Sequence, residues 1–178
     1  MSSPRIVLAG AAGDLGGRLA HALVAAGAHV IALVPPELPR EKRDRLERLG
    51  TAVSLATVAA TDRAAQTRAC EGAVCVVSAL NGLRDVIVDR QTLLLDAARD
   101  AGVRRFIPSD YCEDFTHTTP GQNRNLDLRR EFMARADRAP LQVTSIFNGA
   151  FLELLGAQMP LIQERFRRVL FWRSADQP

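Results

Sequence analysis

The sequence predicts an α/β protein built on a doubly wound parallel sheet of at least six strands. Short apolar runs of strand length alternate with longer segments of helical periodicity along most of the chain. This alternation is typical of successive strand–helix–strand units, whose strands run parallel to one another. A glycine-rich segment follows the first apolar run directly, and this second observation favours the same class.

Six segments are expected to form strands, because each is a short apolar run bounded by polar or turn-forming residues. They are residues 5–9, 29–34, 53–57, 73–77, 104–107 and 141–146. The run at 73–77 is the most apolar of the six, so we expect it to be central and buried on both faces. Six strands with intervening helices fit the spatial order 3-2-1-4-5-6 of a common doubly wound fold.

Between these strands, apolar residues recur every three or four positions, which indicates helices with one buried face. Helices are expected at residues 15–26, 40–49, 61–69, 83–101 and 123–137, with a further helix from about residue 150. Gly27 is expected to cap the first helix at its C-terminal end. The buried face of that helix is predicted to consist of Leu15, Leu19, Ala22, Leu23 and Ala26.

Composition favours a soluble globular protein, since 47% of the 178 residues are hydrophobic and 24% are charged. The net charge of +3 is too small to predict nucleic-acid binding, and the dense basic cluster at 40–48 is interpreted as a solvated helix face. No run approaches the roughly 18 apolar residues that a membrane span needs. The N-terminus shows no signal-peptide pattern, so we expect a cytoplasmic protein.

Three cysteines are present, and they lack the spacing of metal ligands, so no metal site is predicted. Cys75 lies in a strongly apolar run and is expected in the core. Cys112 lies in a polar loop and is interpreted as a passive thiol.

The segment from Gly10 to Gly16 spells G-x-x-G-x-x-G between a predicted strand and a predicted helix. Gly10 would permit a sharp turn, Gly13 would let a pyrophosphate approach the backbone, and Gly16 would let the helix pack closely. The N-terminus of that helix offers unpaired N–H groups to phosphates. The motif therefore predicts a Rossmann-type domain that binds NAD or NADP, whereas a plain strand–helix turn is the alternative. The predicted cofactor residues of this loop are Gly10, Ala12, Gly13, Asp14, Leu15 and Gly16.

The choice between NAD and NADP depends on the end of the second strand, where Val34 and Pro35 are predicted to border the ribose. Neither the acidic residue typical of NAD sites nor the arginine typical of NADP sites stands in the usual place. Glu37 could contact a ribose, while three nearby cations could cover a 2′-phosphate. These cations are Arg40, Lys42 and Arg43. We favour NADP and leave NAD open.

Three segments together resemble the NmrA-like and isoflavone-reductase-like family. Proteins of this family are atypical members of the short-chain dehydrogenase/reductase superfamily. They are GAAGDLGGRLAHALVAAGAHVIALV (10–34), AGVRRFIPSDYCEDF (101–115) and VTSIFNGAFLELL (143–155). The middle segment is the most specific, since it is similar to the V-x-R-F-x-P-S-[ED]-[FY] signature after strand five. The resemblance extends over nearly the whole chain, whereas family members usually run on through a small substrate domain. Residues 1–156 are therefore interpreted as the NAD(P)-binding domain and 157–178 as the start of an incomplete substrate region.

The resemblance also implies roles for residues at the carboxyl ends of the later strands. The loop of Ser78, Ala79, Leu80 and Asn81 would lie along the ribose and nicotinamide. Pro108 and Ser109 would lie beneath the nicotinamide. Structural roles are the alternative, with Ser78 and Asn148 as helix caps and Pro108 as the end of a strand. The residues that would border a substrate pocket are Asp110, Asn148 and Phe151.

Reductases of this family use a lysine on the helix after this loop as a general acid or base, but residues 113–137 contain no lysine. Arg129 could polarise a carbonyl, although an arginine holds its proton too tightly to act as an acid. Tyr111 and His117 are the candidate proton donors, while an exposed loop position is the alternative for His117. The family's acidic residue against the adenine is also replaced, by Ala59 and Ala60.

Two functions follow from the resemblance. The first is an NAD(P)H-dependent reductase of a small aromatic or enone-like substrate, in which the hydride chemistry belongs to the cofactor. The second is a non-catalytic redox sensor that binds the dinucleotide and acts through a partner protein, which the missing lysine favours. We expect no direct contact with nucleic acid or membrane, and a homo-oligomer is compatible with either function.

Overall fold

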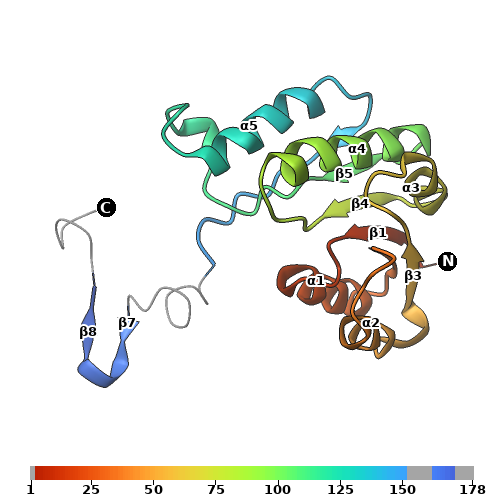
Figure 1. Ribbon diagram of the computed structural model, residues 1–178, viewed down its shortest axis with the longest axis horizontal. Coiled ribbons are helices and arrows are strands. Elements are labelled where there is room, and N and C mark those ends of the chain that lie inside the picture. The colour runs from red at the N-terminus through yellow and green to blue at the C-terminus, as the bar shows by residue number, and fades with distance from the viewer. Residues whose placement is uncertain (1–2, 152–161, 171–178) are drawn as a thin grey trace.

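The structure is a computed structural model that describes residues 3–151 and 162–170 (Figure 1). Six strands form one parallel sheet in the order β3-β2-β1-β4-β5-β6, as the sequence predicts. The strands are β1 (Arg5–Ala9), β2 (His29–Val34), β3 (Val53–Thr57), β4 (Cys75–Ser78), β5 (Arg105–Ile107) and β6 (Gln142–Val143). The chain moves outward from β1 through β2 to β3 and then crosses back to β4, so the connections reverse direction between β1 and β4.

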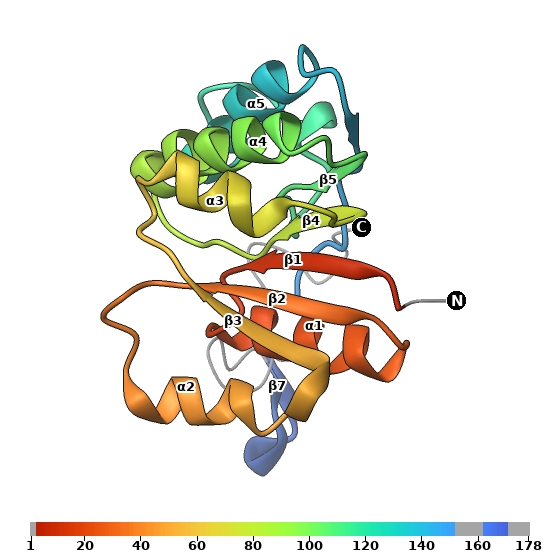
Figure 2. The same cartoon turned by 90° about the vertical axis from the view of Figure 1, so that its right-hand side faces the viewer.

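Helices cover both faces of the sheet, as Figure 2 shows, with α1 and α2 on one face and α3, α4 and α5 on the other. The α-helices are α1 (Asp14–Ala25), α2 (Arg40–Glu47), α3 (Arg63–Cys70), α4 (Gln91–Asp100) and α5 (Arg124–Ala136). A π-helical segment, Asp85–Arg90, leads into α4, and short 3₁₀ turns occur at Gly50–Ala52, Phe115–His117 and Glu164–Phe166.

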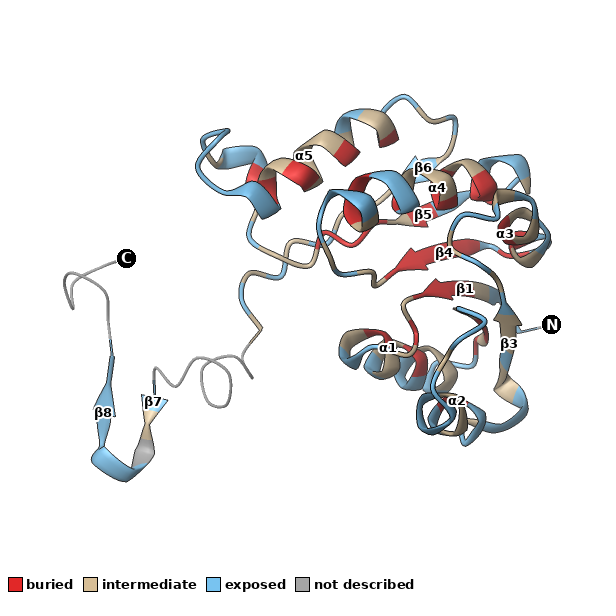
Figure 3. Cartoon of the chain, in the orientation of Figure 1, coloured by how far each residue is buried: buried red, intermediate tan, exposed pale blue. Residues whose placement is uncertain are grey.

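The core consists of two layers because consecutive strand residues point to opposite faces. On β1, Val7 packs with α4 and α5, whereas Leu8 packs with α1 and α2. On β4, Val76 belongs to the first layer, while Cys75 and Val77 belong to the second. Every residue of β4 is buried, which confirms the prediction of a central strand covered on both sides (Figure 3).

The buried face of α1 differs from the predicted one. Gly16 and Ala20 are its buried residues, and the predicted Leu19 and Leu23 are partly buried against the same core. Ala22 and Ala26 are exposed, so the prediction that they face inward is wrong. The helix is rotated because Gly16 lies against the Gly10 carbonyl, and only a residue without a side chain fits there.

Two other elements differ from the expected ones. β6 contains two residues instead of six, because only Gln142 and Val143 pair with β5 before the chain leaves the sheet. A hairpin that the sequence did not predict, β7 (Ile162–Gln163) with β8 (Arg168–Val169), forms a separate antiparallel pair (Figure 1). The helix expected from about residue 150 and the domain boundary expected after residue 156 fall largely outside the described residues.

Candidate functional site

A cavity of about 640 Å³ opens where the carboxyl ends of β1, β2 and β4 meet. Ala9 at the end of β1, Leu33 and Val34 at the end of β2, and Ala79 and Leu80 after β4 line it. The connections reverse between β1 and β4, and ligands of open α/β sheets bind at such a switch point. This cavity is therefore the candidate binding site of the chain.

The glycine-rich loop forms the base of the cavity. Gly10 follows β1 with φ +80°, a left-handed conformation that strongly favours glycine. A Cβ atom at Gly10 would lie 2.5 Å from the carbonyl oxygen of Ala79, so a side chain would collide with the loop after β4. The Gly13 N–H donates to the Gly10 carbonyl at 2.9 Å and closes the turn. The turn therefore depends on the absence of a side chain at Gly10.

Gly16 brings α1 into contact with the same turn. A Cβ atom at Gly16 would lie 2.0 Å from the Gly10 carbonyl oxygen, so any side chain there would collide with the backbone of the turn. Gly13 is the N-cap residue of α1 and has no side chain. The first N–H groups of the helix therefore have no side-chain hydrogen bond from the N-cap residue. The loop presents a helix N-terminus to the cavity, and this arrangement suits a phosphate group.

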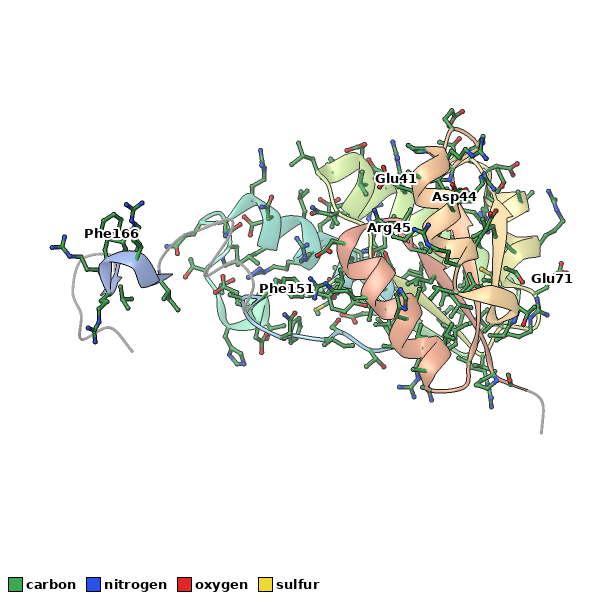
Figure 4. All side chains as sticks on the ribbon, turned by 90° about the horizontal axis from the view of Figure 1, so that it is seen from below. Glu41, Asp44, Arg45, Glu71, Phe151 and Phe166 are labelled. Carbon is green, nitrogen blue, oxygen red and sulfur yellow. The ribbon has the colours of Figure 1, made fainter. Side chains whose placement is uncertain are left out.

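The β2 side of the cavity carries one cation. Lys42 of α2 lies among the lining residues together with Val34, Pro35, Leu38 and Pro39. Of the other polar residues that the sequence offered for a ribose or 2′-phosphate, Glu37, Arg40 and Arg43 are not in the lining. Glu41 and Arg45 pair at 3.2 Å on the exposed side of α2, where Figure 4 shows them with Asp44, so this basic cluster is largely a solvated helix face.

Gln66 of α3 also lines the cavity, near Val58 and Ala60. Its side chain is 5% exposed, and its Nε2 donates to the Ala60 carbonyl at 2.8 Å. Its Oε1 is buried without a hydrogen-bond partner. The sequence contained a signal for this residue, because a glutamine four positions before Cys70 falls on the buried face of a short helix.

The loop after β5 differs because hydrogen bonds within the protein occupy every polar group of Ser109. Its N–H donates to the Gln91 side chain at 3.0 Å, and its hydroxyl donates to the Leu80 carbonyl at 2.6 Å. The Nε of Arg129 donates to its carbonyl at 3.0 Å. Ser109 thus ties the loop after β5 to the loop after β4 and to two helices.

Gln91 makes this arrangement possible and was missed in the sequence. It is fully buried, and its Nε2 donates to the Ile87 carbonyl at 3.1 Å within the preceding π-helical segment. The signal was a glutamine at the start of a buried helical face that continues through Leu94, Leu95 and Ala98.

Asp110 follows Ser109 and is fully buried. The Ser145 hydroxyl donates to its Oδ2 at 2.7 Å, while its Oδ1 is buried without a partner. Burial raises the pKa of Asp110 above its usual value, and the Ser145 hydrogen bond and the Arg129 charge oppose that rise in part. Asp110 therefore joins the β5 loop to the segment that follows β6.

The two candidate proton donors lie in different surroundings. Burial, with the neighbouring Asp110 charge, raises the pKa of Tyr111 to about 12, so the phenol keeps its proton at neutral pH. The His117 side chain is 85% exposed and lies 3.6 Å from the Asp114 carboxylate, outside the cavity lining. The Arg129 guanidinium, considered as a carbonyl-polarising group, donates to the backbone carbonyls of Ser109 and Asn125.

The structure brings about half of the predicted cofactor residues into the cavity lining. These are Gly10, Ala12, Gly13, Val34, Pro35, Ala79 and Leu80. The others do not line it, namely Asp14, Leu15, Gly16, Ser78, Pro108 and Ser109. Asn81, expected with the loop after the fourth strand, also lines the cavity, and so does Arg90, which the sequence did not indicate as a site residue.

The predicted substrate residues Asn148 and Phe151 lie on the segment that leaves β6, outside the cavity lining. Figure 4 shows Phe151 near the main body and Phe166 apart on the hairpin. The Gly149 N–H donates to the Cys112 carbonyl at 3.1 Å, which connects this segment to the β5 loop. Residues 152–161, which follow Phe151, lie outside the described part of the chain.

Cys75 is buried, as expected, and burial raises the pKa of the partly buried Cys112 thiol, in keeping with a passive role. Within residues 3–151 and 162–170, no group of three or more histidine, cysteine or acidic side chains is placed to hold a metal ion. None of the helices in that part is long and apolar enough to cross a membrane.

An open parallel sheet, a glycine turn that opens a helix, and a cavity at the switch point define a Rossmann-type domain. The NmrA-like family matches residues 2–167, and the chain belongs to this family. No curated protein matched the chain by sequence.

Solved structures of reductases share the fold. AtPrR2 with NADP+ and (+)pinoresinol superposes with a TM-score of 0.78 at 26% identity, covering 96% of this chain and 57% of that chain. An isoflavone reductase gives a TM-score of 0.75 at 19% identity, covering 86% and 52%. The complex of leucoanthocyanidin reductase with NADPH from Vitis vinifera gives 0.69 at 22% identity, covering 80% and 49%. The chain thus spans about half the length of these solved relatives.

Proposed function

We propose that the chain binds NADP(H) in the cavity at the glycine-rich loop and acts as an NADPH-dependent reductase of a small organic substrate. The observation that carries this proposal is the turn in which Gly10 and Gly16 exclude any Cβ atom beside the helix N-terminus. The similarity to AtPrR2 with NADP+ and (+)pinoresinol supports the nature of the cofactor. An aromatic or enone-like substrate is the class that we propose.

Lys42 supports NADP over NAD. It is the only lysine of the chain and lines the cavity beside Val34 and Pro35, where the ribose of a bound dinucleotide would lie. An ammonium group there would attract the 2′-phosphate that distinguishes NADP from NAD. Lys42 is thus the proposed source of cofactor preference.

The Lys42 assignment is tested by calorimetric titration of Lys42→Ala with NADPH and NADH. We expect the affinity for NADPH to fall about tenfold, the scale of one lost charge-assisted hydrogen bond, and the affinity for NADH to stay unchanged. Arg40→Ala is the matched control, because Arg40 lies on the same helix outside the lining. An equal loss for both cofactors would contradict the assignment.

In the reductase, a bound NADPH would supply a hydride to the substrate. The loop residues Ala79 and Leu80 would border the nicotinamide, with Pro108 and the tied Ser109 beneath it. Asp110, Asn148 and Phe151 would border the substrate. The proton would come from Tyr111, His117 or water. The test is NADPH consumption by the full-length protein with quinones, enones and aldehydes, and absence of turnover above background would contradict catalysis.

A second candidate function is a redox sensor that binds the dinucleotide without turning it over. It is favoured by the state of the two candidate acids, since Tyr111 holds its proton to about pH 12 and His117 lies exposed outside the lining. The expected result is a clear difference in affinity between NADP+ and NADPH without catalysis. Equal affinities would contradict the sensor, because a ligand pair with no differential affinity shifts no equilibrium.

A further inference from the structure

We propose that Gln66 selects the nucleobase of the cofactor by accepting a hydrogen bond from the exocyclic amino group of adenine. The proposal rests on the proposed function, because it concerns the far end of the same dinucleotide. It assigns base recognition to α3, a helix outside the glycine motif and outside every segment that carries the family resemblance.

The orientation of the Gln66 side-chain amide is fixed by its one hydrogen bond. Nε2 donates to the Ala60 carbonyl at 2.8 Å, and a carbonyl oxygen accepts only from a donor, so the amide nitrogen must face Ala60. Oε1 therefore faces away from Ala60, and it has no partner in the protein. The free group of Gln66 is thus an acceptor and not a donor.

A buried acceptor without a partner weakens the folded protein, so its presence needs an explanation. Gln66 is only 5% exposed to solvent. A leucine or methionine would fill the same space without burying an unpaired acceptor. Gln66 also lines the cavity. A ligand donor that enters this end of the cavity would supply the missing partner.

The part of the ligand that reaches Gln66 follows from the layout of the cavity. The glycine turn at β1 would hold the pyrophosphate, and the end of β2 would border the ribose. Val58, Ala60 and Gln66, which follow β3 in the chain, line the cavity together with the apolar Leu38 and Pro39, and β3 lies beyond β2 in the sheet. A flat, largely apolar base fits this end better than a charged group.

The bases differ at the position where Gln66 would act. Adenine carries an amino group, which donates, whereas hypoxanthine carries an oxygen in its place, which accepts. Hypoxanthine would therefore set two acceptors against each other, and the Gln66 amide cannot reverse without losing its bond to Ala60. A site built to bond a donor rejects the analogue that lacks it more strongly than an apolar pocket does.

The test compares NADPH with its hypoxanthine analogue, reduced nicotinamide hypoxanthine dinucleotide phosphate, by calorimetric titration of the full chain. We expect the unmutated protein to bind NADPH at least about tenfold more tightly, the scale of one unpaired buried polar group. In Gln66→Met, which preserves the volume and removes both the Oε1 acceptor and the Nε2 donor to Ala60, the ratio should fall to within about twofold. Gln122→Met, in an exposed loop, is the matched control and should keep the original ratio.

Equal binding of the two cofactors to the unmutated protein would overturn the role of Gln66 while leaving the proposed function intact. A ratio that persists in Gln66→Met would overturn it as well. Failure to bind either cofactor would overturn both proposals. Because the comparison of cofactors on the unmutated chain needs no variant, a Gln66→Met protein that fails to fold does not remove the test.

Discussion

The two ends of the candidate site are built in different ways. Around the glycine turn, the backbone forms the site, Lys42 and Gln66 line the cavity, and the buried Oε1 of Gln66 has no protein partner. Around the loop after β5, the polar groups of Ser109 are bonded to Gln91, Leu80 and Arg129. The first region is prepared to receive a ligand, whereas the second holds the framework beside it.

The region around the glycine turn should contribute to ligand binding, whereas the region around the loop after β5 should contribute to the positions of the loops. A site of backbone turns and unpaired groups gains partners when a ligand binds, so binding energy comes from it. A region whose hydrogen bonds are complete gains little, but it fixes the relative position of the loops after β4 and β5. Substitutions in the first region should therefore affect affinity, and those in the second should affect stability.

The largest expected effect is at Gly16. Gly16→Val would place a Cβ atom 2.0 Å from the Gly10 carbonyl oxygen, and neither backbone segment can yield without opening the turn. We expect NADPH affinity to fall by more than about 100-fold and the free energy of unfolding to fall by about 1–3 kcal/mol. Calorimetry and urea denaturation measure the two effects.

Gly17→Ala is the matched control, since a Cβ atom at Gly17 lies 3.8 Å from its nearest neighbour, the Ala11 carbonyl oxygen. This change should leave binding intact and stabilise α1 by about 0.5–1 kcal/mol, because alanine is the better helix former. Normal NADPH affinity in Gly16→Val would show that the turn is not the cofactor site.

The next largest effect is at Gln91, in the second region. Gln91→Leu leaves the buried Ser109 N–H without its side-chain acceptor and removes the side-chain hydrogen bond to the Ile87 carbonyl. The free energy of unfolding should fall by about 1–3 kcal/mol, while NADPH affinity should change by less than about threefold, since Gln91 does not line the cavity.

Thermal denaturation measures the stability loss in Gln91→Leu, with Gln122→Leu in the exposed loop as a control that should change stability by less than about 0.5 kcal/mol. If Gln91→Leu abolished binding without lowering stability, the separation between the two regions would be wrong.

The smallest effect is the pH dependence that Asp110 brings to stability. Its pKa in the folded state is raised above the usual 3.8 by burial, so the folded protein holds this proton more tightly than the unfolded chain does. The protonated Asp110 therefore contributes fully to the stability of the folded protein below pH 3.8. This contribution to stability is lost as the pH rises from 3.8 through the raised pKa.

Asp110→Asn keeps an acceptor for the Ser145 hydroxyl and removes the ionisation. Relative to the unmutated protein, this variant should become more stable at pH 7 than at pH 4, as urea denaturation at both pH values would show. Asp137→Asn, at an exposed position, is the control. A difference between variant and unmutated protein that does not change with pH would contradict the raised pKa of Asp110.

Most strand positions and the glycine turn could be predicted because each depends on a local pattern. The sheet order could be predicted because six strands with intervening helices fit a common doubly wound fold. An apolar run marks a strand, and Gly10 and Gly16 mark a turn whose backbone tolerates no side chain. The inward face of α1 was predicted only in part: close packing at Gly16 was expected, but the periodicity of Ala22 and Ala26 indicated burial, and both residues are exposed.

The second region was largely hidden in the sequence because its contacts join distant positions. Gln91 and Ser109 are 18 residues apart, and Asp110 and Ser145 are 35 apart. A buried glutamine on an apolar helical face was a usable signal for both Gln66 and Gln91, although it could not indicate which group each would meet. Ser109 was expected beneath a nicotinamide, and the structure adds that all its polar groups are already bonded.

Hydrogen–deuterium exchange with and without NADPH tests the contrast between the two regions most directly. NADPH should slow exchange in peptides that cover residues 10–17, where the first N–H groups of α1 gain a phosphate partner. Peptides that cover residues 105–112 should change far less, because the Ser109 N–H is already bonded to the buried Gln91. Protection confined to residues 105–112, or no protection at the glycine turn, would contradict the account.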